Sequence, residues 1–358
     1  MLVPRTLEGH HSPRMGGGSR ISAESVDQRI DWLASLVPDP SLPVPEASAA
    51  EVTANGPLVV DTLGALLEAG RVEEASWAIA RLRPYWLNGA NVEQGRRWAE
   101  RVLALPRKAS PAPRVRLLET AATLAFESGD EASARNLFMK SAELARRVGD
   151  ADAEASALGG LARCELMAGN LDAAREAARA CEAIRARRGD EAARIGPLHI
   201  LAYADYIAGD DDAARAGFHR TLEMGRRLGI RHRQAQEMTN LCSVETRAGN
   251  LDAADSLGRE ALEIAVELDH ELLLPYCVIN LAGVASARGE HERAARLLGA
   301  GDALLAQAGM ALNPGTAIEY GRHRAHTTTA LGAWRFDRQY NAGTALSHEG
   351  AVAAARER

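Results

Sequence analysis

A short turn motif repeats along this chain. Each copy has a glycine, then a small polar or acidic residue, and an alanine five positions after the glycine. A sixth copy at Gly89 carries one inserted residue, and a seventh, off-register copy begins at Gly70. A strict period of this length is typical of repeat proteins, in which each unit buries its apolar face against its neighbours. The five regular copies lie 40 residues apart, at Gly129, Gly169, Gly209, Gly249 and Gly289.

A second series of helix breakers lies halfway between the first. It has the same interval of 40 residues, at Gly149, Gly189, Gly229, Asp269 and Gly309. Glycine suits the left-handed position that ends a helix, and Asn or Asp suits the cap that begins the next one. The segments between breakers carry apolar residues at helical spacing. Each unit is therefore predicted to be a helix, a tight turn, a second helix and a loop, with six such pairs from about residue 60 to 310.

Small residues recur at one position in each helix of the pair. A larger side chain at a close helix crossing would force the two helices apart, so we expect these positions to be buried. In the first helix they are Ala122, Ala162, Ala202, Cys242 and Ala282, and in the second helix Ala134, Ala174, Ala214, Ala254 and Ala294.

The composition favours helices over strands. Aromatic residues make up 4% of the chain, and the apolar content is mostly Ala and Leu, which are strong helix formers. The richness in Ala, Arg and Gly is typical of GC-rich bacterial genomes. The net charge is −6, and basic pairs such as Arg146-Arg147 fall in the last turn of a predicted helix, where they complement the helix dipole. This pattern argues against direct nucleic acid binding.

The turn at residues 169–174 and again at 249–254 reads Gly-Asn-Leu-Asp-Ala-Ala, which looks like the tetratricopeptide turn. Tetratricopeptide units usually have about 34 residues, so the helices or the loop would be longer here. Armadillo and HEAT units, of about 40 residues, are the alternative. The predicted fold is an all-α, right-handed α-solenoid of tetratricopeptide-like helix pairs with a 40-residue period.

The two ends of the chain lack this period. Residues 1–20 are expected to be a disordered or engineered tail, and residues 21–57 a short helix with a Ser25 cap followed by a proline-rich linker. The solenoid is placed at residues 58–312. Residues 313–358 are expected to form capping helices, at roughly 316–332 and 347–357.

Several segments resemble one bacterial family. The segments Trp86–Gly89 and Gly95–Leu105 look like the entry to the helical region of large ATP-binding transcriptional regulators of the LuxR and AfsR type. Ala294–Ala300 resembles the last regular repeat of that region, and Gly343–Val352 resembles its closing segment. The resemblance is to the MalT-like tetratricopeptide region, and it covers roughly residues 60–356.

This resemblance implies a regulatory sensor. In such regulators the helical region is thought to sense a ligand or a protein and to control a nucleotide-binding module and a DNA-binding helix-turn-helix. The chain has no G-x-x-x-x-G-K-[ST] phosphate loop, because Gly16-Gly17-Gly18-Ser19 contains no lysine, and no helix-turn-helix with a basic recognition helix. It therefore resembles the sensor region without the ATPase and helix-turn-helix modules.

No set of residues predicts catalysis, a metal site or a cofactor. H-E-x-x-H and G-x-S-x-G sequences are lacking, so an enzyme is not favoured. His323 and His326 share a helix face, which we interpret as a solvated basic surface. No signal peptide or apolar run of membrane-spanning length is found, so we expect a cytoplasmic protein. Four cysteines are expected to be buried small side chains: Cys164, Cys181, Cys242 and Cys277.

Binding is expected on the concave wall that the first helices form in tetratricopeptide arrays. Three of the six tyrosines fall on this wall, and Tyr and Arg commonly supply binding hot spots. We expect these side chains to stand in the groove and to contribute little to the core. The predicted ligand- or partner-binding residues are Arg163, His199, Tyr203, Tyr206, Asn240, Arg247, Tyr276 and Asn280.

Two functions compete at this stage. The first is a protein- or peptide-binding scaffold, acting as a regulatory sensor or adaptor. The second is a small-molecule-binding protein, or an enzyme recruited from such a sensor, with its site in the same groove. An open polar groove would favour the first function, and a tight pocket closed by the C-terminal helices would favour the second. Neither reading includes a membrane or a nucleic acid as partner.

Overall fold

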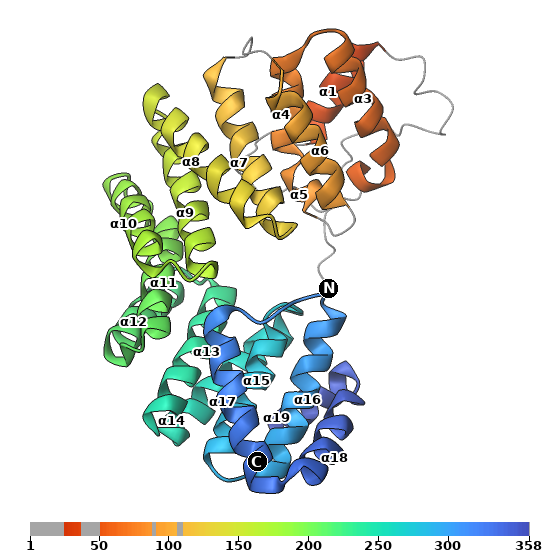
Figure 1. The fold of residues 1–358 in the computed structure, drawn as a ribbon. Coiled ribbons are helices and arrows are strands. Elements are labelled where there is room, and N and C mark those ends of the chain that lie inside the picture. Colours follow the sequence, from red (N-terminus) through yellow and green to blue (C-terminus); the bar gives the residue numbers. More distant parts are fainter. Residues whose placement is uncertain (1–24, 37–50, 88–90, 106–109, 358) are drawn as a thin grey trace, which may run out of the picture. The chain divides into compact units, whose positions relative to one another are not determined.

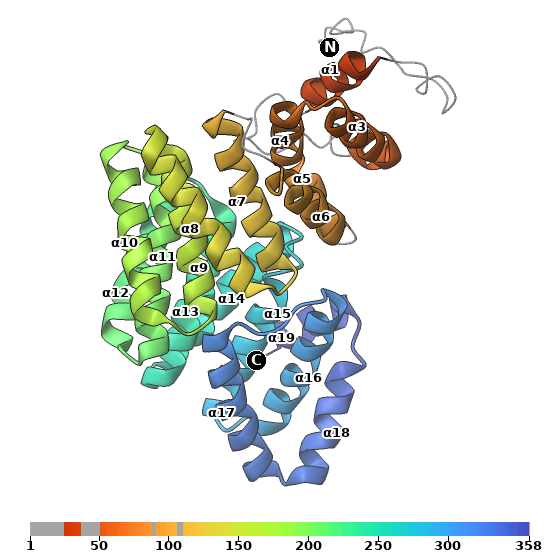
Figure 2. The same cartoon turned by 45° about the horizontal axis from the view of Figure 1, so that its top comes forward.

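The computed structural model describes residues 25–36, 51–87, 91–105 and 110–357, which form helices and connecting turns without a strand (Figure 1). Helix pairs follow one another along the chain (Figure 2), which confirms the predicted all-α solenoid. The chain divides into two compact units, Met1–Ser128 and Gly129–Arg358. The predicted tail at residues 1–20, most of the predicted linker and the turn at Gly89 lie outside the described residues.

The first unit begins with a capped helix. The Ser25 hydroxyl accepts a hydrogen bond from the Gln28 amide at 3.2 Å, and the Ser25 amide donates to the Gln28 side chain at 2.8 Å. This reciprocal pair is a capping box. The third helix of the chain begins at Gly56, so the end of the predicted linker is helical. The described helices of this unit are α1 (Val26–Leu36), α3 (Gly56–Glu68), α4 (Val72–Arg81), α5 (Arg83–Trp86), α6 (Val92–Leu103) and α7 (Pro111–Glu127).

Trp86 is the largest side chain in the core of the first unit. It is fully buried, and its indole nitrogen donates to the Ile79 carbonyl oxygen at 3.1 Å. A Cβ atom at Gly95 would lie 2.6 Å from Cγ of Trp86, so only glycine lets α6 approach the indole. Two of the segments that carried the family resemblance therefore meet in one packing contact.

The second unit contains the most regular pairs. Each helix of about 17 residues ends at one of the predicted breakers, and every breaker glycine of this unit has a positive φ. Asp269 also has a positive φ, of 48°, at the one place where the second series lacks glycine. The paired helices are α8 (Glu131–Val148), α9 (Ala151–Met167), α10 (Leu171–Arg187), α11 (Glu191–Ala208), α12 (Asp211–Arg227), α13 (Arg231–Ala248), α14 (Leu251–Glu267), α15 (Leu274–Ala287) and α16 (His291–Gln307).

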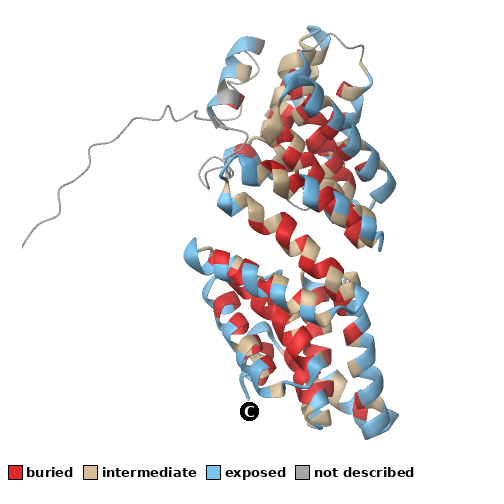
Figure 3. Cartoon of the chain, turned by 90° about the vertical axis from the view of Figure 1, so that its left-hand side faces the viewer, coloured by how far each residue is buried: buried red, intermediate tan, exposed pale blue. Residues whose placement is uncertain are grey.

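The small residues predicted at helix crossings are all buried, with at most 2% exposure in either helix of the pair. Ala174 and Ala214 are completely buried. Around them lie the leucines and further alanines of the core. Figure 3 colours the buried positions along these helices red. The four cysteines are buried too, and none of them forms a disulfide. The repeat is therefore held together mainly by apolar packing between helices.

The C-terminal region has one helix more than predicted. It contains α17 (Pro314–Leu331), α18 (Ala333–Thr344) and α19 (His348–Arg356), and α18 was missed. The backbones of α16 and α18 are in close contact, because a Cβ atom at Gly343 would lie 1.9 Å from the Arg296 carbonyl oxygen. A Cβ atom at Gly299 would similarly lie 2.1 Å from the Tyr340 carbonyl oxygen. These two glycines belong to the segments that resemble the last repeat and closing segment of the regulator family.

Candidate functional site

Helix α17 crosses the face formed by three first helices of the second unit, α11, α13 and α15. In Figure 1 it lies in front of α13 and α15, and its beginning also packs against α11. We call the residues contacted by α17 and by the segment from Ala311 that leads into it the α17 seat. They are Tyr203 and Tyr206 on α11, Arg247 on α13, and Tyr276, Gly283 and Ser286 on α15.

The seat holds the N-terminus of α17 through tyrosines. The Asn313 side-chain oxygen caps α17, accepting from the Thr316 amide at 2.9 Å, and also accepts from the Tyr203 hydroxyl. A Cβ atom at Gly315 would lie 2.6 Å from that hydroxyl and 3.1 Å from the Tyr206 ring. The helix therefore needs a residue without a side chain at this point. Burial raises the pKa of Tyr203 to about 12, so the phenol remains a hydrogen-bond donor at neutral pH.

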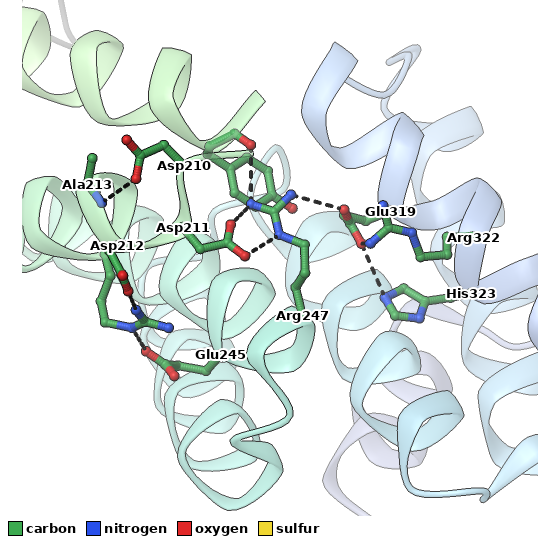
Figure 4. A network of polar contacts seen from close by, with 11 residues as sticks. Asp210, Asp211, Asp212, Ala213, Glu245, Arg247, Glu319, Arg322 and His323 are labelled. Atoms are coloured by element: carbon green, nitrogen blue, oxygen red, sulfur yellow. Dashed lines mark hydrogen bonds and ion pairs between the residues drawn. The ribbon is translucent and has the colours of Figure 1, made fainter. Parts of the chain in front are cut away.

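Arg247 lies at the centre of the seat (Figure 4). Its guanidinium group pairs with Asp211 at the start of α12, and its centre lies 4.3 Å from the ring centroid of Tyr206. It also donates to the Tyr206 carbonyl oxygen at 3.2 Å and pairs with the Glu319 carboxylate of α17 at 3.3 Å. The Arg247 side chain is 18% exposed and that of Glu319 only 6%. A largely desolvated charge pair thus joins α17 to the repeats.

Small and polar groups of α15 contact the next turns of α17. A Cβ atom at Gly283 would lie 2.9 Å from the imidazole of His323, so this glycine makes room for the ring. The Ser286 hydroxyl lies 3.2 Å from Nδ1 of His326 and accepts from the Thr327 hydroxyl at 2.9 Å. Burial lowers the pKa of His323 to about 4, and the positive charge of Arg322 contributes to the shift. The interpretation of this histidine as solvated was therefore wrong.

Four of the eight predicted binding residues come together in the seat: Tyr203, Tyr206, Arg247 and Tyr276. The expectation that they stand free in a groove was wrong for the first two, which are only 5% and 3% exposed. Their rings pack against Phe218 of α12, with centroids 6.4 Å away in each case. Tyr276 is half-buried, and its hydroxyl donates to the Ala311 carbonyl oxygen at 3.4 Å. These side chains support both the core and the attachment of α17.

The other four predicted residues have different surroundings. Nδ1 of His199 lies 3.0 Å from the fully buried carboxylate of Glu237, and its ring stacks near Tyr203. Asn280 donates to the Thr239 carbonyl oxygen at 2.7 Å and is 9% exposed, so its amide serves the structure. The side-chain nitrogen of Asn240 is buried without a hydrogen-bond partner. Arg163 on α9, the last of the four, is exposed.

Ion pairs between successive repeats were not predicted. At three of the five regular turns, an arginine six residues after the turn glycine pairs with an acidic residue four residues before the next turn glycine. The N···O distances in the three pairs are 2.5, 2.9 and 2.6 Å. These pairs could have been predicted from the sequence, because the arginines recur every 40 residues and so do their acidic partners. The pairs are Arg135–Glu165, Arg175–Asp205 and Arg215–Glu245.

The basic clusters lie at helix ends as predicted and are ion-paired. Arg146 pairs with Glu154 at 2.7 Å, and Arg227 pairs with Glu191. Among the described residues, no group of three or more His, Cys, Asp or Glu side chains is arranged to hold a metal ion. None of the described helices has the length and apolar composition to cross a membrane.

Comparison with known proteins supports this architecture. A sequence profile of the tetratricopeptide repeat matches residues 114–187, which include the first regular turn. No protein of curated function matches the chain in sequence. The signal thus identifies the repeat type over part of the chain.

Solved structures match over most of the chain's length. A Rap protein complexed with competence and sporulation factor covers 89% of this chain and 94% of its own, with 14% identity and a TM-score of 0.57. NprR in complex with its cognate peptide NprX covers 89% of this chain and 87% of its own, with 13% identity and a TM-score of 0.55.

A third structure is a signal transduction ATPase, the STAND protein PH0952 from Pyrococcus horikoshii, which has a tetratricopeptide repeat sensor. The match covers 90% of this chain and 47% of that protein, with 14% identity and a TM-score of 0.56. At such low identities these likenesses show the fold alone. The chain is an α-solenoid of tetratricopeptide-like helix pairs.

Proposed function

We propose that this protein is a helical-repeat scaffold that binds a peptide or protein segment on the first-helix face of its second unit. The observation that carries the proposal is α17 itself. This face already holds a helical segment through hydrogen bonds, a charge pair and a fitted glycine. Surfaces that accept one helix by such complementary contacts are suited to accept another.

Two solved relatives in fold support the choice of a peptide as partner. The Rap structure contains competence and sporulation factor, and the NprR structure contains its cognate peptide NprX. We extend the proposal to a regulatory sensor or adaptor in the cytoplasm, of the MalT-like kind that the sequence resembles. The tetratricopeptide sensor of the STAND protein supports that extension at the level of fold.

The small-molecule or enzymatic alternative is less well supported. A small-molecule site would be expected as a tight pocket closed by the C-terminal helices. At the seat the side chains of α17 instead make direct contacts with α11, α13 and α15. The His199 imidazole and the Glu237 carboxylate form a pair of a kind familiar from catalysis, but the rings beside this imidazole are the buried Tyr203 and Phe218.

A peptide-display selection against the immobilised full chain tests the proposal. Selected peptides should bind Arg163→Glu and Arg247→Ala chains at least tenfold more weakly than the parent. Lys140→Glu is the matched control for the first variant, because Lys140 is also exposed but lies on the second helix α8. Selection of peptides that bind all chains equally would contradict the proposed binding face. So would failure to select any peptide on both the parent and a Glu319→Gln chain, in which the pair between Glu319 and Arg247 is broken.

A further inference from the structure

The contacts of α17 with its seat are mainly polar, although Tyr320 and Leu331 of this helix also pack against the apolar core. The buried residues of α17 are Gly315, Thr316, Glu319 and Thr327. Those of α19 are instead the apolar Ala351, Val352, Ala354 and Ala355. Because hydrophobic stabilisation grows with the apolar area buried, α17 gains less from docking than a helix of similar position with an apolar face.

One polar group of the seat makes no hydrogen bond to α17. Tyr206 is only 3% exposed, and its buried hydroxyl has no hydrogen-bond partner on that helix. Burial raises the pKa of the Tyr206 phenol, and the negative charge of Glu319 raises it further, so this donor keeps its proton. A permanent interface normally satisfies such a group across the contact.

Glu319 provides the carboxylate that pairs with the seat. Its carboxylate pairs with Arg247, with Arg322 at 3.2 Å and, at 4.0 Å, with His323 (Figure 4). Gly315 lies four residues earlier, one helical turn away, against the two tyrosines. The seat therefore recognises a helix with no side chain at one position and a carboxylate one turn later.

We propose that residues 313–323 act as an internal ligand of the α17 seat, and that the external partner is a helical segment with the same glycine-to-carboxylate spacing. This inference rests on the proposed function, because it names the partner of the same face. Internal ligand and partner exclude each other, since both place a carboxylate against Arg247. Tethering gives α17 an effective concentration in the millimolar range, so a free partner competes poorly until α17 is released.

A labelled peptide with the sequence of residues 311–326 is the probe, added to the full-length protein in a fluorescence-anisotropy titration. The parent chain should bind it weakly. Glu319→Gln in the chain breaks the internal pair while keeping Arg247, and should strengthen probe binding at least tenfold. Adding Arg247→Ala to that variant should abolish the gain. Arg175→Ala is the matched control, because that side chain is 19% exposed, is also ion-paired, and lies outside the seat.

The probe itself is varied in the same experiment. Replacing its glutamate by glutamine, or the glycine corresponding to Gly315 by leucine, should each remove at least nine-tenths of the binding to the Glu319→Gln chain, because each change removes one recognition element. Hydrogen exchange across α9–α16 verifies that every chain variant keeps its fold. Equal probe binding by parent and Glu319→Gln chains would overturn the internal-ligand proposal.

The two proposals fail in different ways. If display-selected peptides depend on Arg247 but bind parent and Glu319→Gln chains equally, the binding face stands and the internal ligand does not. Hydrogen exchange can instead show that α17 is released in the Glu319→Gln chain. If neither the probe nor any selected peptide then binds that chain, both the proposed binding function and the internal ligand fail.

Discussion

The helix pairs of the second unit and the α17 seat are held by different forces. Between successive pairs, alanines at the crossings let helices approach closely, and the surrounding leucines bury apolar area. At the seat, α17 is held by a tyrosine–asparagine bond, a charge pair and hydroxyl contacts. Apolar packing of the first kind costs much to undo, whereas charged and polar groups regain water when they separate. The difference indicates a permanent scaffold that carries an exchangeable helix.

The close packing between helices is tested most severely at the crossing of α16 and α18. Gly343→Ala places a methyl group against the backbone of α16, and we expect it to destabilise the second unit by about 3 kcal/mol. Gly321→Ala is the matched control. A Cβ atom there meets nothing within 4 Å, so helix propensity should stabilise α17 by about 0.5–1 kcal/mol. Urea unfolding of both variants measures the two effects, and equal midpoints would refute the close backbone contact.

The repeat register gives a second test of the packing. Ala174→Leu and Ala214→Leu should each destabilise the protein by about 1–3 kcal/mol, because both side chains are completely buried at crossings. Denaturant midpoints unchanged in both variants would count against the assigned register.

The sequence anticipated this half of the molecule well. Gly169 and Ala174 could be placed because the same turn motif occurs five times at a fixed interval, so each copy supports the assignment of the others. Helix α18 was missed because its apolar residues are few and outside the period, and its packing depends on two glycines, Gly299 and Gly343, that are distant in sequence.

The seat was only partly predictable. Arg247 and the tyrosines could be placed on the first helices by register, but nothing in the sequence linked Arg247 to Glu319, 72 residues away, because that contact occurs once and does not follow the period. The burial of Tyr203 follows from the same unforeseen docking of α17. The expectation that Tyr203 contributes little to the core is therefore wrong. Tyr203→Ala should cost about 3 kcal/mol.

Acid should selectively weaken the docking of α17 on its seat. The pKa of His323 is lowered to about 4 from an ordinary value of 6.5 when α17 is docked, so the detached helix binds the proton more readily. Docking is fully favourable above pH 6.5 and weakens as pH falls toward 4, by about 2 kcal/mol at pH 5.

Hydrogen exchange of α17 at pH 7.5 and 5, corrected for the intrinsic rate, measures this effect. The charged and titratable neighbours are Glu319, Arg322 and His326 on α17, with His291 of α16 facing the last of these. A His323→Asn chain should lose the pH response. An undiminished response in that chain would assign it to another group.

The smallest expected effect concerns nucleic acid. The basic clusters at the helix ends are occupied by acidic partners, and the net charge is −6, so we predict no DNA binding in gel shifts at physiological salt. A salt-sensitive complex with a dissociation constant below about 1 μM would contradict this, since non-specific binders reach only about 10⁻⁴–10⁻⁶ M there.

The most direct test of the central claim compares α17 with α19 by native-state hydrogen exchange on the full-length protein. If α17 is an exchangeable helix on a permanent scaffold, its amides from Ala317 to Thr327 should exchange at least tenfold faster than those of α19, and in a local opening that leaves α15 protected. Protection of α17 equal to that of α15 and α19, lost only in global unfolding, would contradict the account.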